Sequence, residues 1–506
     1  MKRKHLFLLA FSLLFVVFSC VKDNVVDISR KLPQEPPPPA TSGNTITMDS
    51  LRSLAMNLPA IFSQQPQTRS TGKTIKEIVS LSSFFNQPAT RTATVSGKNP
   101  VSDIYVVNYS GDAGFAIISA DTRLVDVLAY SDYGNITDTL DNPGVKLFMS
   151  GVYDYADYML NYLPEKGDSV AVHGMVLPKN SGAKTTARYD APKTLSTVIE
   201  TVNENPYYPP EEDDGYYYYQ ETVEEITDWS GTVRGPLVKV NWGQYFPFNE
   251  YVPICPTTGY HMPAGCVATA IAQIMSYHKW PETIGSSYTS FTNLNWDVLA
   301  SRKYGPEFND SDEKHQIATL FSYIGTNVGM EYDCYENGGS GSNIGKAESA
   351  FGTKFIYLSD GVVSYSTHQV RSDLRDVNNP KPVYVRGADK NGNGAHAWVV
   401  DGFKDQYRIC MELAYWYRYE GGDSPHELFV VDTLRTYKYI NDYVHCNWGW
   451  EGTNNGWFYD NAFIDRTYFR TDYPAEEEPG NSYYDQGQFS INVEMIKNLR
   501  PRGKTK

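Results

Sequence analysis

Residues Ala264–Pro281 read AGCVATAIAQIMSYHKWP, and this stretch decides the fold of the C-terminal half of the chain. Val267–His278 contains several alanines and no helix breaker, which predicts a closely packed helix that ends before Pro281. Gly265 gives this helix a flexible entry, so Cys266 stands at its N-terminus, where unpaired N–H groups and the helix dipole favour the thiolate. Cys266 is therefore a candidate nucleophile. The alternative is a small buried hydrophobic residue, which is the commoner state of a free cysteine.

Composition limits what the whole chain can be. Its 506 residues are 41% hydrophobic and 20% charged, which is enough for two globular domains with linkers. The formal charge of −15 argues against a nucleic-acid partner, because such binding relies on Lys and Arg that neutralise phosphates. The six cysteines are too few for a disulfide-built scaffold, although one or two bridges remain possible: Cys20, Cys255, Cys266, Cys334, Cys410 and Cys446.

The N-terminus has the features of an export signal. Basic residues precede an apolar run over Leu6–Phe18, which is short for a membrane span and typical of a secretory signal peptide at 1–19. The run ends in Val17-Phe18-Ser19-Cys20, which resembles the box where bacterial lipoproteins are cut and acylated. We therefore expect an exported protein held at the cell envelope only by a lipid on Cys20, unless this is an ordinary signal peptide with a chance cysteine. The polar, proline-rich residues 20–44 predict an extended tether.

Residues 45–164 are predicted to form a small α+β domain. Apolar residues at helical spacing indicate two helices, and apolar runs bounded by turn residues indicate three strands. The helices are Met48–Leu58, which we expect Pro59 to end, and Val145–Leu163; the strands are Ile104–Asn108, Gly114–Ser119 and Val125–Tyr130. The domain carries no cluster of nucleophile, base or metal ligands, so its residues alone indicate a structural or binding module.

Residues 165–236 differ from the segments on either side. They are acidic, include Pro209-Pro210 and the tyrosines Tyr216–Tyr219, and contain little that could form a core. We expect a linker, and exposed linkers are where proteolytic cleavage concentrates.

Residues 237–506 form the second predicted domain. It is helical around Cys266 and again near Lys314–Met330, and strand-rich afterwards. Helices followed by antiparallel strands indicate an α+β fold. The predicted strands are Pro382–Arg386, Ala397–Phe403, Glu427–Asp432 and Tyr439–Asn447, with a hairpin turn at Asn391–Gly394 between the first two.

A thiolate nucleophile needs a partner that stabilises it and later protonates the leaving amine, and histidine does both near neutral pH. His396 is the best candidate, because it follows a glycine-rich turn and opens an apolar strand that would hold it rigidly at the edge of a cleft. A packed histidine at a strand end is the alternative. His278 lies at the end of the Cys266 helix, and His315 and His368 lie in polar surroundings.

Two further segments complete a possible catalytic site. In Cys446-Asn447-Trp448-Gly449-Trp450, the Asn447 amide could orient an imidazole while the tryptophans shield that hydrogen bond from water. The chain order of cysteine, histidine and asparagine is that of papain-like enzymes. Upstream of the cysteine, the side-chain N–H of Gln244 could donate to the oxyanion together with the backbone N–H of Cys266.

These segments resemble the streptopain family of bacterial cysteine peptidases. The matching stretches span nearly all of the second domain: Asn241-Trp242-Gly243-Gln244, Pro247-Phe248-Asn249, Gly265–Ala270, Ala272–Met275, Tyr277–Pro281, His396-Ala397-Trp398-Val399, Asp401-Gly402 and His445–Trp450. The first domain is similar to the inhibitory propeptide of that family through Tyr105–Asn108 and Gly114–Asp121.

The resemblance implies a papain-like cysteine endopeptidase made as a zymogen. Cys266 would be the nucleophile, His396 the general acid and base, and Gln244 the oxyanion donor. Its substrates would be proteins or peptides, its own propeptide would inhibit it, and no cofactor or metal is expected. Where the family favours glycine before the histidine, this chain has Ala395, which fits only if that position does not need positive φ. Asn447 and Trp448 compete for the third catalytic role.

Three other interpretations compete with this one. A metal site could draw on Cys255, His261, Cys266, His445 and Cys446, but their spacing lacks the tight pairs of structural zinc sites. A Cys–His pair could also hydrolyse or transfer acyl groups on a substrate other than protein. Finally, the chain could be a binding lipoprotein whose cysteine and histidine are inactive.

Overall fold

The structure, a computed structural model, describes residues 44–62, 73–85, 99–137, 141–162, 231–285, 291–407, 441–464 and 491–503 with their side chains. It describes further strands by their backbone alone within 163–230 and 408–440. The predicted signal peptide, Cys20 and the tether up to residue 43 lie outside these residues. Within the described ranges, no helix combines the length and apolar character that crossing a membrane requires.

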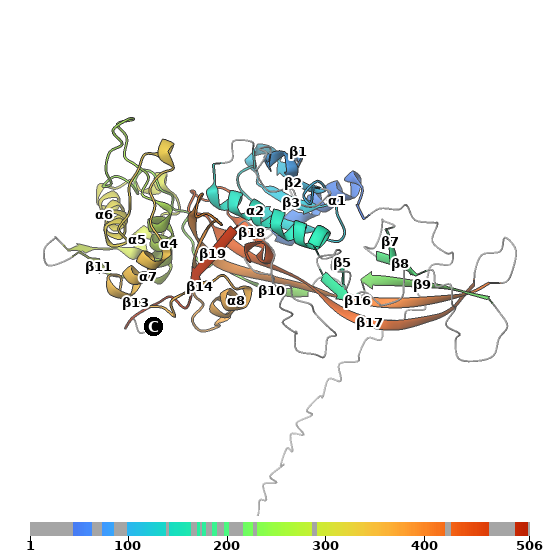
Figure 1. The fold of residues 1–506 in the computed structure, drawn as a ribbon. Helices are drawn as coiled ribbons and strands as arrows, with labels where there is room; N and C mark the ends of the chain where they lie inside the picture. Colours follow the sequence, from blue (N-terminus) through green and yellow to red (C-terminus); the bar gives the residue numbers. More distant parts are fainter. Residues whose placement is uncertain are drawn as a thin grey trace, which may run out of the picture.

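The first domain is a four-stranded antiparallel sheet, β1-β2-β3-β4, with two main helices, as Figure 1 shows in blue and teal. The predicted helices and strands are confirmed, and β1 is an addition. The elements are α1 (Met48–Phe62), β1 (Ile75–Ser80), η2 (Leu81–Phe85), β2 (Ile104–Tyr109), η3 (Ser110–Asp112), β3 (Phe115–Ser119), β4 (Val127–Ser131), α2 (Pro143–Asp157) and η4 (Tyr158–Tyr162).

Helix α1 passes through Pro59 instead of ending there, so that prediction was wrong. A proline inside a helix leaves the carbonyl four residues earlier without its helical donor. Here the Tyr109 hydroxyl donates to that carbonyl, on Ala55, over 2.7 Å. Beyond the proline, Phe62 is buried and its ring lies 5.0 Å from that of Tyr443 in the second domain. Tertiary contacts therefore outweigh the local preference.

The second domain has a helical part and an antiparallel β part, which confirms the α+β prediction (Figure 1). The helical part contains α4 (Cys266–His278), β11 (Thr283–Ile284), β12 (Thr292–Asn293), α5 (Trp296–Leu299), η5 (Gly305–Glu307), α6 (Ser311–Asn327), η6 (Tyr335–Asn337) and α7 (Ile344–Thr353). The remaining elements are β10 (Ser230–Arg234), β13 (Tyr357–Leu358), β14 (Val362–Ser364), α8 (Thr367–Arg375), β15 (Val383–Asp389), β16 (His396–Tyr419), β17 (Glu427–Asn447), β18 (Gly456–Tyr459), η7 (Asp460–Phe463), β19 (Ile491–Ile496) and β20 (Arg500–Pro501).

The sheets of the two domains join into one. Strand β4 of the first domain pairs antiparallel with β18 of the second, with Ser131, Tyr130 and Ala129 opposite Gly456, Trp457 and Phe458. The strand order is β1-β2-β3-β4-β18-β17-β16-β15-β19-β14. Helix α2 of the first domain lies over the β part of the second (Figure 1). One hydrophobic core contains residues of both domains.

Strands β15 and β16 separate two cores. Successive side chains of a strand point to opposite faces. Trp398 and Val400 of β16 belong to the core shared with the first domain, whereas Ala397 and Val399 belong to the core around α4. The central strands of the second domain therefore lie between α2 on one face and α4 on the other.

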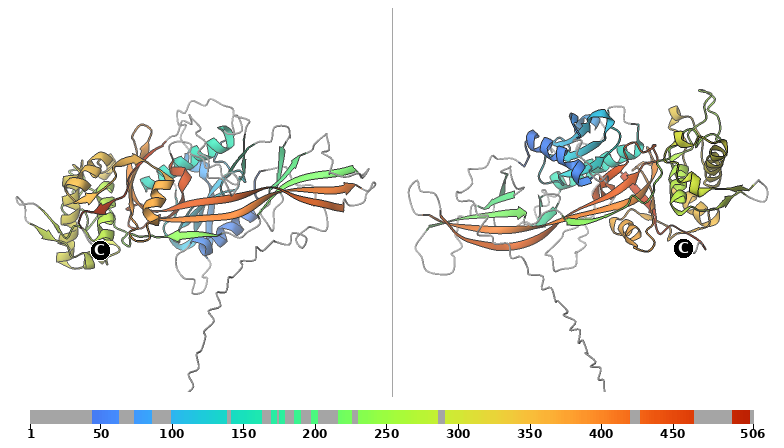
Figure 2. Two further views of the ribbon diagram at one scale, coloured as in Figure 1. Left: turned by 90° about the horizontal axis from the view of Figure 1, so that it is seen from below. Right: turned by 180° about the vertical axis from the view of Figure 1, so that it is seen from behind.

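Residues 165–236, which we expected to be a linker, contain five strands that precede β10: β5 (Ser169–Val172), β6 (Met175–Pro178), β7 (Thr185–Tyr189), β8 (Thr197–Thr201) and β9 (Tyr216–Glu225). Strands β9 and β10 pair with β16. The predicted strands Glu427–Asp432 and Tyr439–Asn447 are parts of one strand, β17, that pairs with β16 in a long hairpin reaching away from the helical part (Figure 2). Ladder hydrogen bonds join backbone groups, so a polar stretch within β17 does not interrupt the strand.

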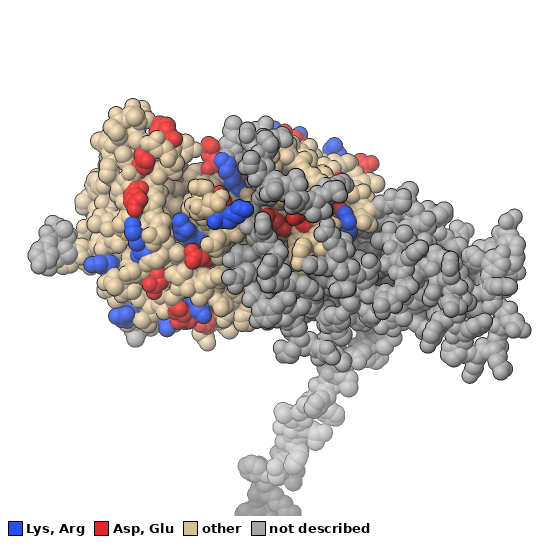
Figure 3. Space-filling model, in the orientation of Figure 1, with Lys and Arg blue, Asp and Glu red and all other residues tan. Residues whose placement is uncertain are grey.

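Acidic and basic side chains are interspersed over the described surface on the face that Figure 3 shows.

Candidate active site

Cys266 is the first residue of α4, as predicted. The preceding Gly265 has φ 91°, a conformation that side chains rarely adopt, and a Cβ there would lie 2.7 Å from Sδ of Met330. Glycine is thus required for the chain to enter the helix in this direction. The thiol is only partly exposed.

Burial raises the pKa of the Cys266 thiol above its ordinary value. The backbone N–H groups of Ala397, Val267 and Cys266 itself and the charge of Arg386 act in the opposite direction, but more weakly. The sequence led us to expect that the helix N-terminus would favour the thiolate. In this arrangement the neutral thiol is favoured, because desolvation exceeds the effect of the N–H groups.

His396 is the first residue of β16 and is buried among indole rings. Its ring is parallel to that of Trp398, with centroids 6.3 Å apart, and lies 5.9 Å from that of Trp450. Nε2 lies 2.9 Å from the carbonyl oxygen of Trp448, which can only accept, so Nε2 carries the proton. Burial lowers the pKa of His396 to about 4, although this hydrogen bond opposes the shift. The imidazole is therefore neutral at neutral pH.

The thiol and the imidazole lie on opposite sides of β16. Strand alternation places the His396 side chain with Trp398 and Val400, on the face that α2 covers. The Cys266 thiol meets the backbone N–H of Ala397, whose side chain faces α4. Among the described residues, the imidazole has its hydrogen bond to Trp448 and none to the thiol. The predicted nucleophile and the predicted base are therefore not hydrogen-bonded to each other in this structure.

Gln244 lies beside the first turn of α4. Its backbone oxygen accepts a hydrogen bond of 2.9 Å from Ala264, two residues before the cysteine. The neighbouring carbonyl of Gly243 accepts one of 3.3 Å from Oγ1 of Thr269. Gln244 is buried to 8% exposure. The predicted oxyanion donor is thus held next to the helix start.

Asn447 is buried, and its amide does not contact His396. Its Nδ2 donates to Val240 over 2.9 Å, and its Oδ1 accepts from Nε2 of Gln273 over 3.0 Å. The amide therefore ties β17 to α4 and to the segment before Gln244. Trp448, which competes for the same role, is the residue bonded to His396 here, through its backbone carbonyl.

A short segment of the first domain, Asp141–Gly144, contacts both sides of the site. The hydroxyl of Tyr335 is hydrogen-bonded to the Asp141 carboxylate. Asn142 caps α2, since its Oδ1 accepts from the backbone N–H of Gly144 over 3.1 Å. A Cβ on Gly144 would lie only 2.2 Å from the Trp448 ring and 3.0 Å from Cδ2 of His396. Because Gly144 has no side chain, the start of α2 can lie directly against the imidazole and the indole.

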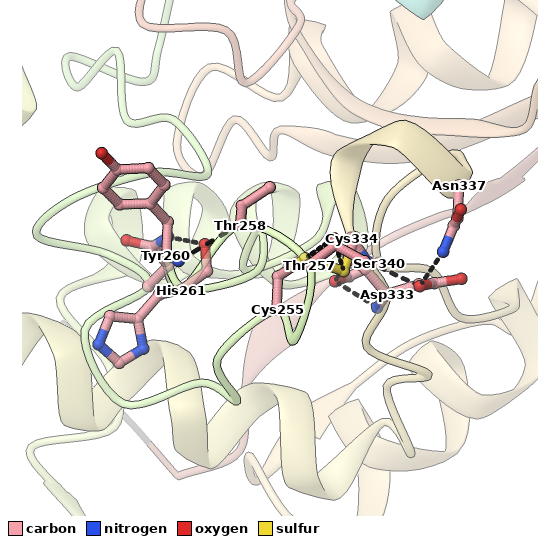
Figure 4. The surroundings of a disulfide bond; sticks show 10 residues. Cys255, Thr257, Thr258, Tyr260, His261, Asp333, Cys334, Asn337 and Ser340 are labelled. Carbon is pink, nitrogen blue, oxygen red and sulfur yellow. Dashed lines mark hydrogen bonds between the residues drawn. A yellow bond between two sulfur atoms is a disulfide. The ribbon is translucent and has the colours of Figure 1, made fainter.

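A disulfide between Cys255 and Cys334 holds the loop that carries Tyr335 (Figure 4). Oγ1 of Thr257 lies beside both sulfurs, at 2.9 Å from that of Cys255 and 3.7 Å from that of Cys334. Both cysteines are buried. The bridge joins the chain just before Cys266 to the loop beside Met330, so it fixes one wall of the site. One of the bridges that the sequence left open is thus present.

The residues of the alternative metal site have other partners. Cys255 forms a disulfide with Cys334, and Nδ1 of His445 lies 2.6 Å from Oδ1 of Asp401. Among the described residues, the one group close enough to share an ion is Cys255, Cys334 and Glu336. Its two sulfurs are bonded to each other, so neither is the free thiolate that a metal would need.

Sequence reasoning missed three residues that shape the site: Gln273, Tyr335 and Gly144. Gln273 could have been noticed as a long polar side chain on an otherwise small and apolar helix face. Tyr335 and Gly144 carry no such signal, because their roles come from contacts between segments far apart in the chain. Ala395, which departs from the family pattern, does not have positive φ, so the alanine is accommodated.

Comparison with known proteins gives two family matches. Residues 242–458 match the Peptidase C10 family, and residues 51–155 match the Spi protease inhibitor family. Streptopain of Streptococcus pyogenes is 23% identical over 403 residues, covering 72% of this chain and 75% of streptopain. The thiol protease/hemagglutinin PrtT of Porphyromonas gingivalis is 24% identical over 378 residues, covering 71% of this chain and 34% of PrtT.

Solved structures that resemble the chain include two from Prevotella intermedia. A fragment of prointerpain A that carries a cysteine-to-alanine substitution is 19% identical, and the match covers 81% of this chain and 98% of the fragment, with a TM-score of 0.44. Active interpain A cysteine protease is 22% identical and covers 52% of this chain and 94% of its own, with a TM-score of 0.33.

Proposed function

The chain belongs to the Peptidase C10 (streptopain) family of cysteine peptidases, and on this premise we propose that it is an exported endopeptidase made as a zymogen. Cys266 is the nucleophile, His396 the general acid and base, and Gln244 the oxyanion donor. Residues 45–164 are the inhibitory prodomain. The observation that carries this proposal is the contact of Asp141–Gly144 with both sides of the site, at Tyr335 and at His396.

In the active arrangement, the imidazole takes the proton of the Cys266 thiol and forms an ion pair with the thiolate. The thiolate attacks the substrate carbonyl carbon, and the oxyanion accepts hydrogen bonds from the Gln244 side chain and the Cys266 backbone N–H. The imidazolium then gives its proton to the leaving amine as the C–N bond breaks. Water, deprotonated by the neutral imidazole, hydrolyses the thioester and restores the thiol and imidazole pair.

The described arrangement is the latent one. Its imidazole is neutral and bonded to the Trp448 carbonyl, and burial keeps the thiol protonated. Activation requires the His396 side chain to leave the α2 face and approach Cys266. The start of α2 opposes this movement because Gly144 packs directly against the imidazole and Trp448. Removal of the prodomain frees that space.

Asn447 and Trp448 share the role of the third catalytic residue, which supports the cysteine and the histidine. Asn447 holds α4 and β17 to residues 240–244, the segment that ends in Gln244 and that we call the oxyanion segment. Its amide therefore acts as a positioning group. Trp448 offers the imidazole its carbonyl in the latent state and shields it with its ring.

Maturation falls within 165–236, the segment that separates the prodomain from the catalytic domain. Export follows from the predicted signal peptide at residues 1–19, and Cys20 carries the lipid.

The lipid anchor is tested separately from catalysis. Replacing Cys20 with alanine should move the protein from the membrane fraction to the soluble fraction or block processing. An unmodified N-terminus beyond Val21 in mass spectrometry would contradict the lipid anchor.

Labelling with a peptide-like thiol alkylator tests the peptidase assignment. We expect the processed protein to be labelled at Cys266 and the uncut chain to be labelled much more slowly, because the prodomain covers the site. An acyl hydrolase acting on other substrates has no reason to prefer a peptide-like reagent over iodoacetamide. An inactive binding protein has no reason to contain one hyper-reactive cysteine. Equal labelling of all free cysteines would contradict the proposal.

A further inference from the structure

Glu451 is a half-buried carboxylate in the turn that follows Trp448. It has φ 53°, a left-handed conformation that residues other than glycine adopt uncommonly. Neighbouring Gly449 and Gly452 also have positive φ, but they carry no side chain. Strained positions of this kind persist where the surrounding structure holds them, and they concentrate at binding and catalytic sites.

The turn is packed tightly between α4 and the oxyanion segment. A Cβ on Gly449 would lie 2.9 Å from Cγ2 of Thr269, and one on Gly452 would lie 2.7 Å from Nδ2 of Asn241. A Cβ on Gly243, the residue before Gln244, would lie 2.6 Å from Cγ of Glu451. The Glu451 side chain is therefore fixed directly beside the segment that carries the oxyanion donor.

Among the described residues, the Glu451 carboxylate forms no ion pair and no hydrogen bond. Gly243 and Gly305 are among its neighbours, since a Cβ on either glycine would lie within 3.3 Å of the Glu451 side chain. Burial raises the pKa of Glu451 above its ordinary value. A carboxylate that is partly desolvated without a partner costs stability, so its presence needs another explanation.

The position of Glu451 relative to the scissile bond follows from the roles of its neighbours. A Cβ on Gly243, the residue before the proposed oxyanion donor Gln244, would lie 2.6 Å from Cγ of Glu451. Glu451 therefore lies beside the segment that faces the carbonyl group of the scissile bond. Trp450, the residue before Glu451, lies 5.9 Å from the His396 ring in the latent arrangement.

We infer that Glu451 forms a subsite for a basic side chain, lysine or arginine, on the substrate residue that follows the scissile bond. This inference rests on the proposed function, because it presumes cleavage at Cys266. The ammonium or guanidinium group would supply the charge and the N–H donors that the carboxylate lacks. An acidic residue at the same substrate position would be repelled.

The test uses the processed enzyme and three quenched peptides that differ only after the scissile bond, where they carry arginine, glutamine or glutamate. A hydrogen bond to a charged group is worth enough to raise kcat/KM for the arginine peptide about tenfold over the glutamine peptide. Glu451→Gln should bring this ratio close to one. The control Glu336→Gln removes an exposed carboxylate from the Tyr335 loop and should leave the ratio unchanged.

A pH series on the unaltered enzyme provides a second readout. The preference should be full where Glu451 is ionised and should disappear as the pH falls through its raised pKa. An unaltered enzyme without a preference, or a ratio that survives in Glu451→Gln, would overturn the inference. If the processed enzyme cuts none of the peptides and also fails to cut casein, a general protein substrate, the proposed peptidase function is wrong. This result is distinct from a failure of the Glu451 subsite alone.

Discussion

Two helices from different domains cover the two faces of strand β16. Helix α4 packs on the face of Ala397 and Val399 and belongs to the same domain. Helix α2 packs on the face of His396 and Trp398 and comes from the prodomain. The alternation of one strand thus separates the imidazole from the thiol. In the proposed account, latency depends on a partner that keeps the histidine on the second face.

Loss of either proposed catalytic group should have the largest effect. Cys266→Ala deletes the proposed nucleophile with little change in volume, and His396→Ala deletes the proposed acid and base. Either variant of the processed enzyme should lose several orders of magnitude in kcat, because such residues act as a unit. Peptide hydrolysis assays and circular dichroism measure the effect and the fold. Turnover within about tenfold of the unaltered enzyme would rule out the assignment.

The α2 side should be sensitive to size at Gly144. An alanine there would place its Cβ against the Trp448 ring and should weaken prodomain docking. We expect the uncut Gly144→Ala chain to show at least about tenfold more peptidase activity than the uncut parent. This corresponds to a loss of about 1.4 kcal/mol in the free energy of prodomain docking. The matched control is Lys146→Ala, on the exposed face of the same helix. Equal latency in the two variants would mean that α2 does not hold His396.

Acid should weaken the same contact. His396 has a pKa of about 4 in the latent state, and release should return it toward its ordinary 6.5. The neutral His396 therefore contributes fully to the free energy of prodomain docking above about pH 6.5. This contribution falls as the pH drops toward 4, by at most about 3 kcal/mol. Amide exchange in β4, measured in uncut Cys266→Ala and corrected for intrinsic rates, should rise over this range.

Asp460 provides an acid response of a different kind. It is buried in η7, and burial raises its pKa to about 7. Protonation on acidification therefore favours the folded catalytic domain, so acid should loosen prodomain docking without unfolding the region around Asp460. An acid response that is the same in uncut Cys266→Ala and in its His396→Ala derivative would contradict the role of His396.

Loss of the disulfide should have the smallest effect on turnover. Replacing Cys255 and Cys334 together with serine frees a loop of 79 residues, which costs about 2–4 kcal/mol of stability. We expect a lower Tm and a KM raised a few-fold, because the Tyr335 loop is no longer fixed, with kcat nearly unchanged. Thermal unfolding and peptide kinetics measure both. A large loss of kcat with an unchanged KM would show that the disulfide positions Cys266 and not the Tyr335 loop.

The sequence predicted those parts of the molecule that local patterns determine. The helix that starts at Cys266, the strand that starts at His396 and the small α+β prodomain follow from periodicity and turn residues. The continuation of α1 through Pro59 could not be predicted, because the Tyr109 hydroxyl that replaces the lost donor lies far along the chain. The same holds for the β4–β18 pairing and for Gly144 against His396, since both depend on contacts between domains.

The central claim is that the prodomain keeps His396 buried and apart from Cys266. Histidine hydrogen exchange followed by mass spectrometry reports the pKa of His396 in Cys266→Ala, before and after processing by added unaltered enzyme. We predict a pKa of about 4 in the uncut chain and a return toward the ordinary 6.5 after the prodomain is removed. A pKa near 6.5 in the uncut chain would contradict this account.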